Sequence, residues 1–519
     1  MSISVPEMIS LTAYFVLMLG IGIYAYRKST SDVSEYMLGG RQLHPAVGAL
    51  SAGASDMSGW MLMGLPGAIY LSGLNAAWIA VDLTIGAYFN YRLVAPRLRV
   101  YTEMAGDSIT IPDYFEKRFN DRTHALRILS SLVIVVFFTL YTSAGVVAGG
   151  KLFESAFGLD YTVGLFVTAG VVLAYTMIGG FLAVSLTDFV QGTIMFLALL
   201  IVPIVTLLAI GGLGNVESAI LSAPPALTAD GSTGPTRSGF FNWTDGLTLV
   251  GFISLMSWGL GYFGQPHIIV RFMAIRSLKD IATARYIGMS WMIVTVIGAV
   301  LVGLVGVAYV AQNQLHAEIT DPETVFILLS QSLFHPFVSG FLLAAILAAI
   351  MSTISSQLLV SSSSLTEDIY KAFVRRDASQ TELVLIGRIS VCVVAIVAVL
   401  LAFDRSSNIL SLVSNAWAGF GAAFGPIILM SLYWKGMTRD GALAGMLVGA
   451  GTVLFWLYAP VTIGGQSLSQ IIYEIVPGFA MSLLAAYTTS VFGRSPKPEV
   501  TEAHDALETA MGQDPQPLF

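Results

Sequence analysis

Charged residues are scarce in this sequence of 519 amino acids. Asp, Glu, Lys and Arg make up only 11% of it, hydrophobic residues make up 55%, and the mean hydropathy is +0.77. A soluble protein carries about 25% charged residues, so this composition excludes an ordinary soluble chain. The formal net charge of −7 belongs partly to the acidic C-terminal segment, and it makes nucleic acid an unsuitable partner.

Cysteine is nearly absent as well. Cys392 is the single one, and it lies inside an apolar run. One cysteine forms no disulfide within its own chain, so the sequence does not indicate redox chemistry. We interpret Cys392 as a small buried hydrophobic residue.

Motifs for nucleotides and for zinc are incomplete. Residues 145–151 spell G-x-x-x-x-G-K, but Leu152 occupies the position where a phosphate-binding loop needs Ser or Thr. Residues 259–264 spell G-x-G-x-x-G inside an apolar run with no preceding strand, and the six histidines are dispersed without an H-E-x-x-H pair. None of these patterns indicates an ATPase, a dinucleotide site or a zinc enzyme.

Apolar runs of about 20 residues recur through the chain, each long enough to cross the ~30 Å hydrocarbon layer of a bilayer. We predict an all-α polytopic membrane domain over residues 1–494, followed by an acidic cytoplasmic tail over residues 495–519. The first run lacks a basic leader and precedes Arg27 and Lys28, so it is expected to stay as a span. Thirteen spans are expected to begin near Pro6, Pro45, Ala76, Leu126, Tyr161, Asp188, Trp243, Tyr286, Val325, Leu383, Asn408, Gly441 and Gln470.

The distribution of basic residues predicts the orientation. With the N-terminus outside, all of the 25 Lys and Arg residues except Lys151, Arg237 and Arg405 fall on the cytoplasmic side. This bias agrees with the positive-inside rule. It also predicts a cytoplasmic C-terminus.

An acidic residue interrupts the second span. Asp56 lies in an otherwise uncharged run, within SAGASDMSGW at residues 51–60, and a carboxylate at mid-span costs about 2.5 to 3.5 kcal/mol. Glycine and serine are poor residues for a continuous helix, so we predict a broken helix here. Unwound backbone at membrane depth must line a cavity, where its carbonyls can bind a cation. The alternative is that Asp56 only caps a kink and is paired internally.

A second interruption is expected five spans later, in SWGLGYFGQP at residues 257–266. Matching breaks predict an inverted five-plus-five repeat, spans 2–6 and 7–11, with discontinuous first helices and with spans 1, 12 and 13 peripheral. Trp258 and Tyr262 lie four residues apart on one predicted helical face. They form either an apolar wall for a substrate ring or ordinary packing.

Hydroxyl side chains cluster in the ninth span. Ser352, Ser355 and Ser356 share one helical face and Thr353 lies beside them. Such hydroxyls often only join helices to one another. They are also suitable ligands for a hard monovalent cation.

Five segments carry a family resemblance: LGGRQLHPAVGALSAGASDMSGWMLMGLPGA, IGGFLAVSLTD, SLMSWGLGYFGQPH, AAIMSTISSQLL and NAWAGFGAAFGP. With these segments the sequence resembles the sodium/solute symporter family, most closely its proline-transporting members. The similarity runs from the second to the eleventh span.

The resemblance implies a set of site residues. A Na⁺ site is implied at the carbonyls of Ala54, Met57 and Ala349 and the hydroxyls of Ser352 and Thr353, with Asp56 as an essential carboxylate beside it. The substrate contacts that it implies are Ser55, Ser58, Gly59, Tyr141, Trp258, Tyr262 and Pro266. Arg41 and Asp188 match positions with gating or structural roles.

The expected function is sodium-coupled symport of L-proline into a bacterial cell by alternating access. The expected location is the cytoplasmic (inner) membrane, in contact with the lipid bilayer, with Na⁺ as the coupling ion and without an obligatory protein partner. No Lys or Arg is expected mid-span near the two breaks. A compact zwitterion therefore suits the site better than a multiply charged anion.

Other functions remain open at this point. Relatives with the same cation site carry sugars, vitamins or inorganic anions instead of proline. A channel would use similar oxygen ligands without saturable uptake, and a membrane sensor would continue into a signalling module where this sequence has only residues 495–519. An enzyme is not expected, because no catalytic pair is recognisable within the spans.

Overall fold

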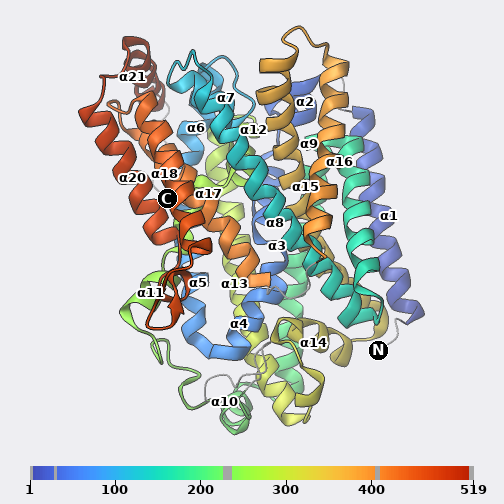
Figure 1. Cartoon of the computed structure of the whole chain (residues 1–519). Helices are drawn as coiled ribbons and strands as arrows, with labels where there is room; N and C mark the ends of the chain where they lie inside the picture. The colour runs from blue at the N-terminus through green and yellow to red at the C-terminus, as the bar shows by residue number, and fades with distance from the viewer. Residues whose placement is uncertain (1–3, 29–31, 226–236, 404–408, 514–519) are drawn as a thin grey trace.

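Helices form most of the described molecule. The computed structural model describes residues 4–28, 32–225, 237–403 and 409–513. Within them, ten helical ranges are long and apolar enough to cross a membrane, and Figure 1 shows the long helices side by side with short helices at both ends. The all-α polytopic architecture is therefore confirmed, while the count of thirteen spans and the inverted repeat stay predictions.

The elements follow one another in two halves. The first half contains α1 (Val5–Lys28), α2 (Val33–Leu38), η1 (Gly39–Arg41), α3 (Pro45–Gly59), η2 (Trp60–Gly64), α4 (Leu65–Ser72), η3 (Gly73–Ala77), α5 (Trp78–Phe89), η4 (Asn90–Val94), α6 (Ala95–Met104), α7 (Ile111–Arg118), α8 (Ala125–Phe157), α9 (Tyr161–Ile210) and α10 (Leu213–Ser222). The second half contains η5 (Arg237–Gly239), α11 (Leu249–Leu255), η6 (Trp258–Gly264), α12 (Pro266–Ala274), α13 (Leu278–Gln312), η7 (His316–Glu318), η8 (Pro322–Thr324), α14 (Val325–Leu333), α15 (Pro336–Ser363), η9 (Ser364–Val374), α16 (Gln380–Leu401), α17 (Ile409–Tyr433), α18 (Arg439–Tyr458), β1 (Thr462–Ile463), β2 (Gln466–Ser467), α19 (Leu468–Ile471), α20 (Ile475–Phe492) and α21 (Pro498–Gln513).

Helix α9 folds back on itself. Fifty helical residues would extend ~75 Å, far beyond the bilayer, and Gly180 interrupts them with φ 57° and ψ −148°. Gly180 packs against Tyr36 of α2, whereas Tyr161 and Ile210 form hydrogen bonds with residues at the C-terminal ends of α16 and α13. The two parts of α9 therefore cross the same thickness in opposite directions.

Several predicted span starts are wrong by five to eleven residues. The predicted starts Trp243, Tyr286, Val325 and Gln470 are replaced by Leu249, Leu278, Pro336 and Ile475, and Asn408 lies outside the described residues. Local chemistry sets the observed starts: Ser277 accepts a hydrogen bond from the backbone N–H of Asp280 and so caps α13, and Pro336 occupies the first turn of α15. The ninth start was mistaken because α14 is as apolar as a span but only nine residues long.

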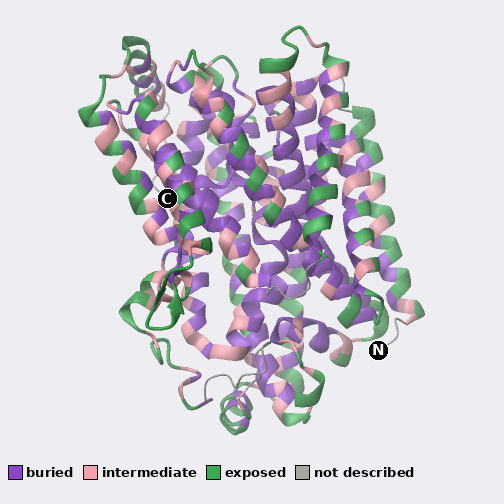
Figure 2. Cartoon of the chain, viewed as in Figure 1, coloured by how far each residue is buried: buried purple, intermediate pink, exposed green. Residues whose placement is uncertain are grey.

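Burial separates a central group of helices from a peripheral one. In the range that contains α15, 83% of the most apolar stretch is buried, against 33% for α1 and α18 and 28% for α20. Figure 2 shows buried residues concentrated in the middle and exposed ones on the outer helices. Because α15 carries the predicted hydroxyl cluster, that cluster lies inside the protein and away from lipid.

The acidic C-terminal segment forms the helix α21, which packs on the body at the end where α6 and α7 lie (Figure 1). Arg97 of α6 donates two hydrogen bonds to Glu508, at 2.5 and 3.1 Å, and Lys435 donates to Asp505 at 2.6 Å. Leu507 is fully buried. Most of residues 495–519, predicted as an acidic tail, is thus a docked helix.

Glu508→Gln is expected to loosen α21 without unfolding the protein. A partly exposed ion pair contributes about 0.2 to 1 kcal/mol, so proteolysis after Arg494 or Lys497 should become up to about fivefold faster. Hydrogen bonds from Arg97 hold the pKa of Glu508 below its ordinary value. The contact is therefore retained at neutral pH and is lost only as the pH falls through that lowered pKa.

Trypsin cleavage of detergent-solubilised protein, followed over time at several pH values, measures this effect. Glu502→Gln is the matched control, because Glu502 lies on the exposed side of the same helix. Equal cleavage of the two variants would contradict the role given to Glu508.

Candidate ion and substrate site

The second span is interrupted two residues after Asp56. Helix α3 is regular to Met57, and Ser58 then has φ 49° and ψ −168°, a backbone conformation that serine rarely adopts. The Ser58 hydroxyl accepts a hydrogen bond from the backbone N–H of Trp60 at 3.2 Å, which stabilises the turn. The predicted break is therefore present, with Asp56 beside it and buried.

The second predicted interruption is also present, but it is not α-helical. Helix α11 ends at Leu255, η6 is a short 3₁₀ segment, and α12 begins at Pro266. Glycines allow close approach here: a Cβ on Gly261 would lie 1.9 Å from Nε1 of Trp417, and one on Gly259 would lie 2.5 Å from the carbonyl oxygen of Asp82. Because η6 is a 3₁₀ segment and not an α-helix, the prediction that Trp258 and Tyr262 share an α-helical face is wrong.

A side-chain contact joins the two interruptions. The hydroxyl of Tyr262 in η6 donates a short hydrogen bond to Oδ2 of Asp56 in α3, and both residues are buried. Asp56 thus has a partner from another element, and it does more than cap its own helix. A movement of η6 therefore changes the surroundings of Asp56, and a movement of α3 changes those of Tyr262.

Neutral oxygen atoms of α3 and α15 meet beside Asp56. The hydroxyl of Ser352 donates to the carbonyl oxygens of Ala54 at 2.7 Å and Ala349 at 3.1 Å, and Thr353 donates to Ala349 at 3.2 Å. The carbonyl of Met57 accepts from the backbone N–H of Trp60. The predicted ion-binding oxygens of Ala54, Ala349, Ser352 and Thr353 are therefore brought together.

The chemistry of these oxygens fits an alkali cation. In the described part of the chain, no group of three or more His, Cys, Asp or Glu residues could hold a metal ion. Carbonyl and hydroxyl oxygens with one nearby carboxylate suit a hard monovalent ion that must also be released. A divalent site would need more negative charge.

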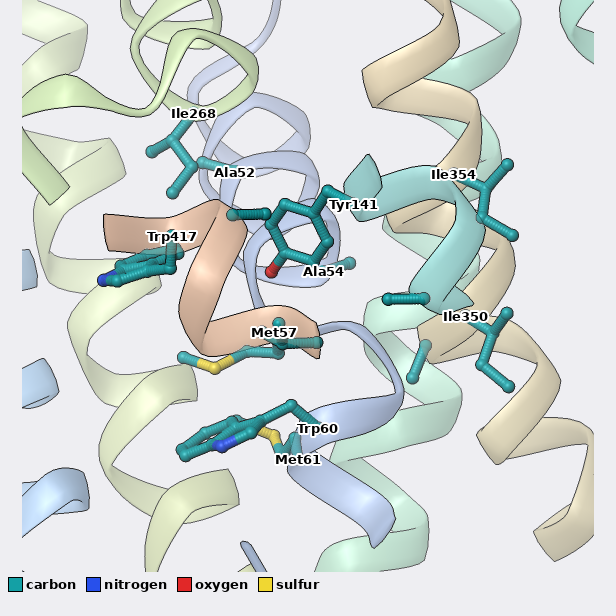
Figure 3. Close-up of a cluster of buried hydrophobic side chains, with 14 of the residues drawn as sticks. Ala52, Ala54, Met57, Trp60, Met61, Tyr141, Ile268, Ile350, Ile354 and Trp417 are labelled. Carbon is teal, nitrogen blue, oxygen red and sulfur yellow. The ribbon is translucent and has the colours of Figure 1, made fainter. Parts of the chain in front are cut away.

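Aromatic side chains enclose a small cavity next to this cluster. The cavity is lined by Asp56, Met57, Trp60, Leu83, Tyr141, Trp258, Val413 and Trp417. Figure 3 shows Met57, Trp60, Tyr141 and Trp417 gathered beside the irregular turn of α3. Only about 10 Å³ is open to the centre of a water molecule, which is room for about one water. The cavity is therefore too small to hold a solute much larger than a water molecule.

The predicted substrate residues are divided between this cavity and the backbone around it. Tyr141 and Trp258 line the cavity, and Tyr262 lines a neighbouring one that also includes Asp56. The remaining four lie outside the cavity lining: the Ser55 hydroxyl bonds to Ala52, Ser58 stabilises the turn, Gly59 packs against Ile350 and Ala148, and Pro266 starts α12.

Sequence reasoning missed Trp60, Leu83, Val413 and Trp417 in the cavity lining. An aromatic or branched residue in an apolar span gives no signal that separates lining from packing. Trp60 and Trp417 did lie within segments that carried the family resemblance, and that was the available signal. Nε1 of Trp417 donates to the carbonyl oxygen of Trp258 at 2.7 Å.

The expectation that no Arg lies mid-span near the breaks is wrong. Arg271 of α12 is fully buried and donates to Asp188 at 3.3 Å, to Ser51 at 3.1 Å and to Ser356 at 2.5 Å. Ser51 also donates to Asp188 at 2.7 Å. Asp188 is the counter-charge of Arg271, and neither residue lines the aromatic cavity. The preference for a compact zwitterion therefore stays a prediction.

Arg41 lies apart from the cavity. Its guanidinium donates to Asp107 at 2.5 Å, to Thr102 at 3.1 Å and to the carbonyl oxygens of Ser108 and Met273. It therefore ties the end of α6 to the end of α12. The contacts suit a structural or gating role and involve none of the cavity residues.

The chain is similar to known transporters over nearly its whole length. The model of the sodium:solute symporter family matches residues 36–449. The high-affinity proline transporter PutP of Bacillus subtilis (strain 168) is 56% identical over 96% of this chain and 100% of its own length. The osmoregulated proline transporter OpuE of the same strain is 56% identical over 95% of this chain and 96% of its own.

A sodium/proline symporter of Staphylococcus aureus (strain JH9) is 54% identical over 94% of this chain and 93% of its own length. Among solved structures, a Na⁺-coupled sialic acid symporter in a substrate-bound outward-open state superposes with a TM-score of 0.79 at 19% identity, covering 95% of this chain and 99% of the other. The nucleobase-cation symporter Mhp1 has a TM-score of 0.51 at 13% identity and covers 92% and 99%. At these identities the two structures establish the fold alone.

Asp188→Asn is expected to destabilise the protein strongly, because it leaves the buried Arg271 without a counter-charge. The cost of such an unpaired charge is about 3 to 5 kcal/mol. The double variant Asp188→Asn with Arg271→Gln should lose less stability than Asp188→Asn alone, since no charge then remains in the interior. Thermal unfolding in detergent measures both.

Asp280→Asn serves as the control, because it removes the carboxylate of the exposed pair with Arg276, at 2.7 Å, and should change the melting temperature little. If Asp188→Asn unfolds at the same temperature as this control, the buried pair does not hold α9, α3 and α12 together.

Proposed function

The chain is a member of the sodium:solute symporter family, and from that premise we propose that it takes up L-proline together with Na⁺ across the bacterial cytoplasmic membrane. The observation that carries this proposal is the hydrogen bond between Tyr262 and Asp56. It joins the two helix interruptions between a cluster of neutral oxygens and an aromatic cavity. An ion bound at the oxygen cluster and a solute bound in the cavity would therefore both contact the segments that this hydrogen bond joins.

Proline as the solute is supported by relatives and by chemistry. Three proteins that are 54–56% identical over more than nine tenths of this chain are named proline transporters or sodium/proline symporters. The aromatic rings of Tyr141 and Trp258 suit an aliphatic ring, and the neutralised surroundings suit a zwitterion. Helix ends at the two breaks and the bound cation would face its carboxylate.

The Na⁺ ligands would be the carbonyls of Ala54, Met57 and Ala349 and the hydroxyls of Ser352 and Thr353. At present the hydroxyl of Ser352 donates to Ala54 and joins α15 to α3. Na⁺ would replace this hydrogen bond. The carbonyl oxygens and the hydroxyl lone pairs would then coordinate the ion, and the ion would join α15 to α3. Asp56 lies beside the cluster and supplies the negative potential.

Coupling follows from the shared contact. Binding of Na⁺ at α3 would fix Asp56, Asp56 would fix Tyr262, and η6 would then present Trp258 to the solute. If ion binding favours solute binding in this way, the solute must favour the ion by the same factor. Because the cavity has room for about one water, α3, η6 and α17 must separate before proline can enter.

One ion supplies enough energy. A charge that enters through about 100 mV gains ~2.3 kcal/mol, and a tenfold inward gradient adds ~1.4 kcal/mol. Their sum supports accumulation of several hundredfold. We place the N-terminus outside and the C-terminus in the cytoplasm. Lys151 contacts Glu323, just before α14, and Arg237 contacts Pro224, just after α10, and Figure 1 shows α10 and α14 at the end of the bundle opposite to α6 and α7. Arg97, Arg99, Lys117 and Arg118 belong to α6 and α7, so the positive-inside rule places the cytoplasm on that side.

Asp56→Asn and Thr353→Val are each expected to raise the sodium concentration needed for half-maximal proline uptake by about tenfold or more. Loss of a charge-assisted contact costs about 1.5 to 3 kcal/mol. The measurement is uptake of labelled proline into proteoliposomes at varied sodium concentration. Thr193→Val is the matched control, since Thr193 is exposed and bonds only within its own helix. Unchanged sodium dependence in both site variants would remove the proposed ion site.

Trp258→Ala is expected mainly to raise the proline concentration for half-maximal uptake, about tenfold or more, because a large aromatic contact is lost. Trp243→Ala, in a partly exposed tryptophan that packs on Trp78, should leave it unchanged. A defect of Trp258→Ala confined to the sodium requirement would contradict the substrate role.

A further inference from the structure

Trp258 has two aromatic neighbours, of which one lines the cavity and the other does not. Its ring lies 6.1 Å from that of Trp60, which also lines the cavity. It is stacked on the ring of Tyr473 at 5.2 Å and 29°, and Tyr473 does not line the cavity. The ring that we assign to the substrate is therefore supported by a residue outside the pocket.

Tyr473 belongs to the connection between α18 and α20, residues 459–474, which we call the 459–474 connection. Its hairpin, β1 and β2, is exposed, and Figure 1 shows it beside α11, at a distance from α7 and α21. In contrast, Tyr473 and Glu474 at its end are buried, with 8% and 2% of their surface exposed. The connection thus inserts one aromatic residue into the protein.

Polar contacts hold this insertion on two sides of the second interruption. The hydroxyl of Tyr473 donates to the carbonyl oxygen of Ser414 in α17 at 2.7 Å, and its backbone N–H donates to the hydroxyl of Ser254 in α11 at 3.1 Å. With its side-chain amide turned to donate, Asn415 of α17 lies 2.9 Å from Oε1 of Glu474. Helices α11 and α17 are therefore joined through residues 473 and 474.

These are the elements that must separate for a solute to enter. The cavity is lined by Trp258 from η6, which follows α11, and by Val413 and Trp417 from α17. While Tyr473 is in place, α11, η6 and α17 are held together by one ring stack and two hydrogen bonds. Opening of the pocket on this side requires that the 459–474 connection release at least one of them.

We propose that Tyr473 positions Trp258 for the solute and that the 459–474 connection closes the pocket on the side where the N-terminus lies. The proposal rests on the proposed function, because it assigns a role within the same proline site. Tyr473 is a positioning residue: it acts through Trp258 and does not touch the solute. The last two spans of the chain are then part of the transport machinery through this one side chain.

Uptake kinetics provide the first test. Tyr473→Ala should raise the proline concentration for half-maximal uptake about three- to tenfold, the range for loss of one aromatic stack. Tyr473→Phe keeps the ring and loses only the hydroxyl, so it should stay closer to the unaltered protein. Tyr458→Ala, in the same pair of helices but at a residue that is 71% exposed, is the matched control and should show no change. Equal kinetics for the Tyr473→Ala and Tyr458→Ala variants would overturn the proposal.

Cysteine accessibility provides a second test that a general loss of stability would not imitate. Cys392 is the only cysteine, so Cys392→Ser with Val413→Cys carries one thiol, at the cavity. An impermeant thiol reagent added from outside should label it, and Na⁺ with proline should protect it. Tyr473→Leu, which keeps an apolar side chain but no ring, should abolish that protection at equal protein amount. Full protection in this variant would overturn the proposal.

The two hypotheses fail differently. If the unaltered chain shows no sodium-dependent proline uptake, the proposed function fails. If it transports proline and the Tyr473 variants behave like the Tyr458 control, only the role of Tyr473 fails.

Discussion

The hydrogen bond between Tyr262 and Asp56 determines how the centre of this protein is arranged. A carboxylate inside a membrane protein is tolerated only where it has a partner, and here the partner comes from the second unwound segment. The two breaks therefore have to lie side by side, which places the hydroxyls of α15 against one flank of Asp56 and the aromatic cavity against the other. The elements around this contact accommodate it: glycines let η6 approach α5 and α17, and the large indole rings fill the space that the unwound backbone leaves.

A second buried polar contact, the ion pair between Arg271 and Asp188, lies in the same region. Removing two opposite charges from water is costly, so a buried pair of this kind adds little to net stability, whereas loss of one partner alone is strongly destabilising. Four elements supply its members, α3, α9, α12 and α15. The Arg271–Asp188 ion pair and the hydrogen bond from Tyr262 to Asp56 each join the first predicted repeat to the second. A conformational change that separates α12 from α3 has to break the charged group, whereas one that separates η6 from α3 has to break the neutral one.

The sequence predicted the helical class and the two breaks because both rest on strong physical rules. Long apolar runs have no other stable form in a bilayer, and Asp56 among small residues is too costly for an uninterrupted helix. The family resemblance grouped Ser352 with Ala54, and the hydroxyl of Ser352 donates to the carbonyl oxygen of Ala54; the ion site itself stays a prediction. The sequence failed where a residue type has two ordinary uses: nothing in it distinguished Trp60 and Trp417 from packing residues, and Arg271 was counted among the basic residues of the cytoplasmic side. The ninth span start was displaced because α14 is apolar yet short, so that composition alone does not separate it from α15. The route of the 459–474 connection was beyond the sequence, since the position of Tyr473 depends on how α18 and α20 pack.

The glycines of η6 also limit how this protein can change over evolutionary time. Any side chain at Gly259 or Gly261 would collide with Asp82 or Trp417, so almost no mutation in that stretch of backbone is tolerable. Leu83 and Val413 face the same cavity from regular helices, and a smaller side chain at either position would enlarge the cavity without placing any atom against the unwound segment. A descendant that acquires a different cargo would therefore more readily change these two positions than the glycines of η6.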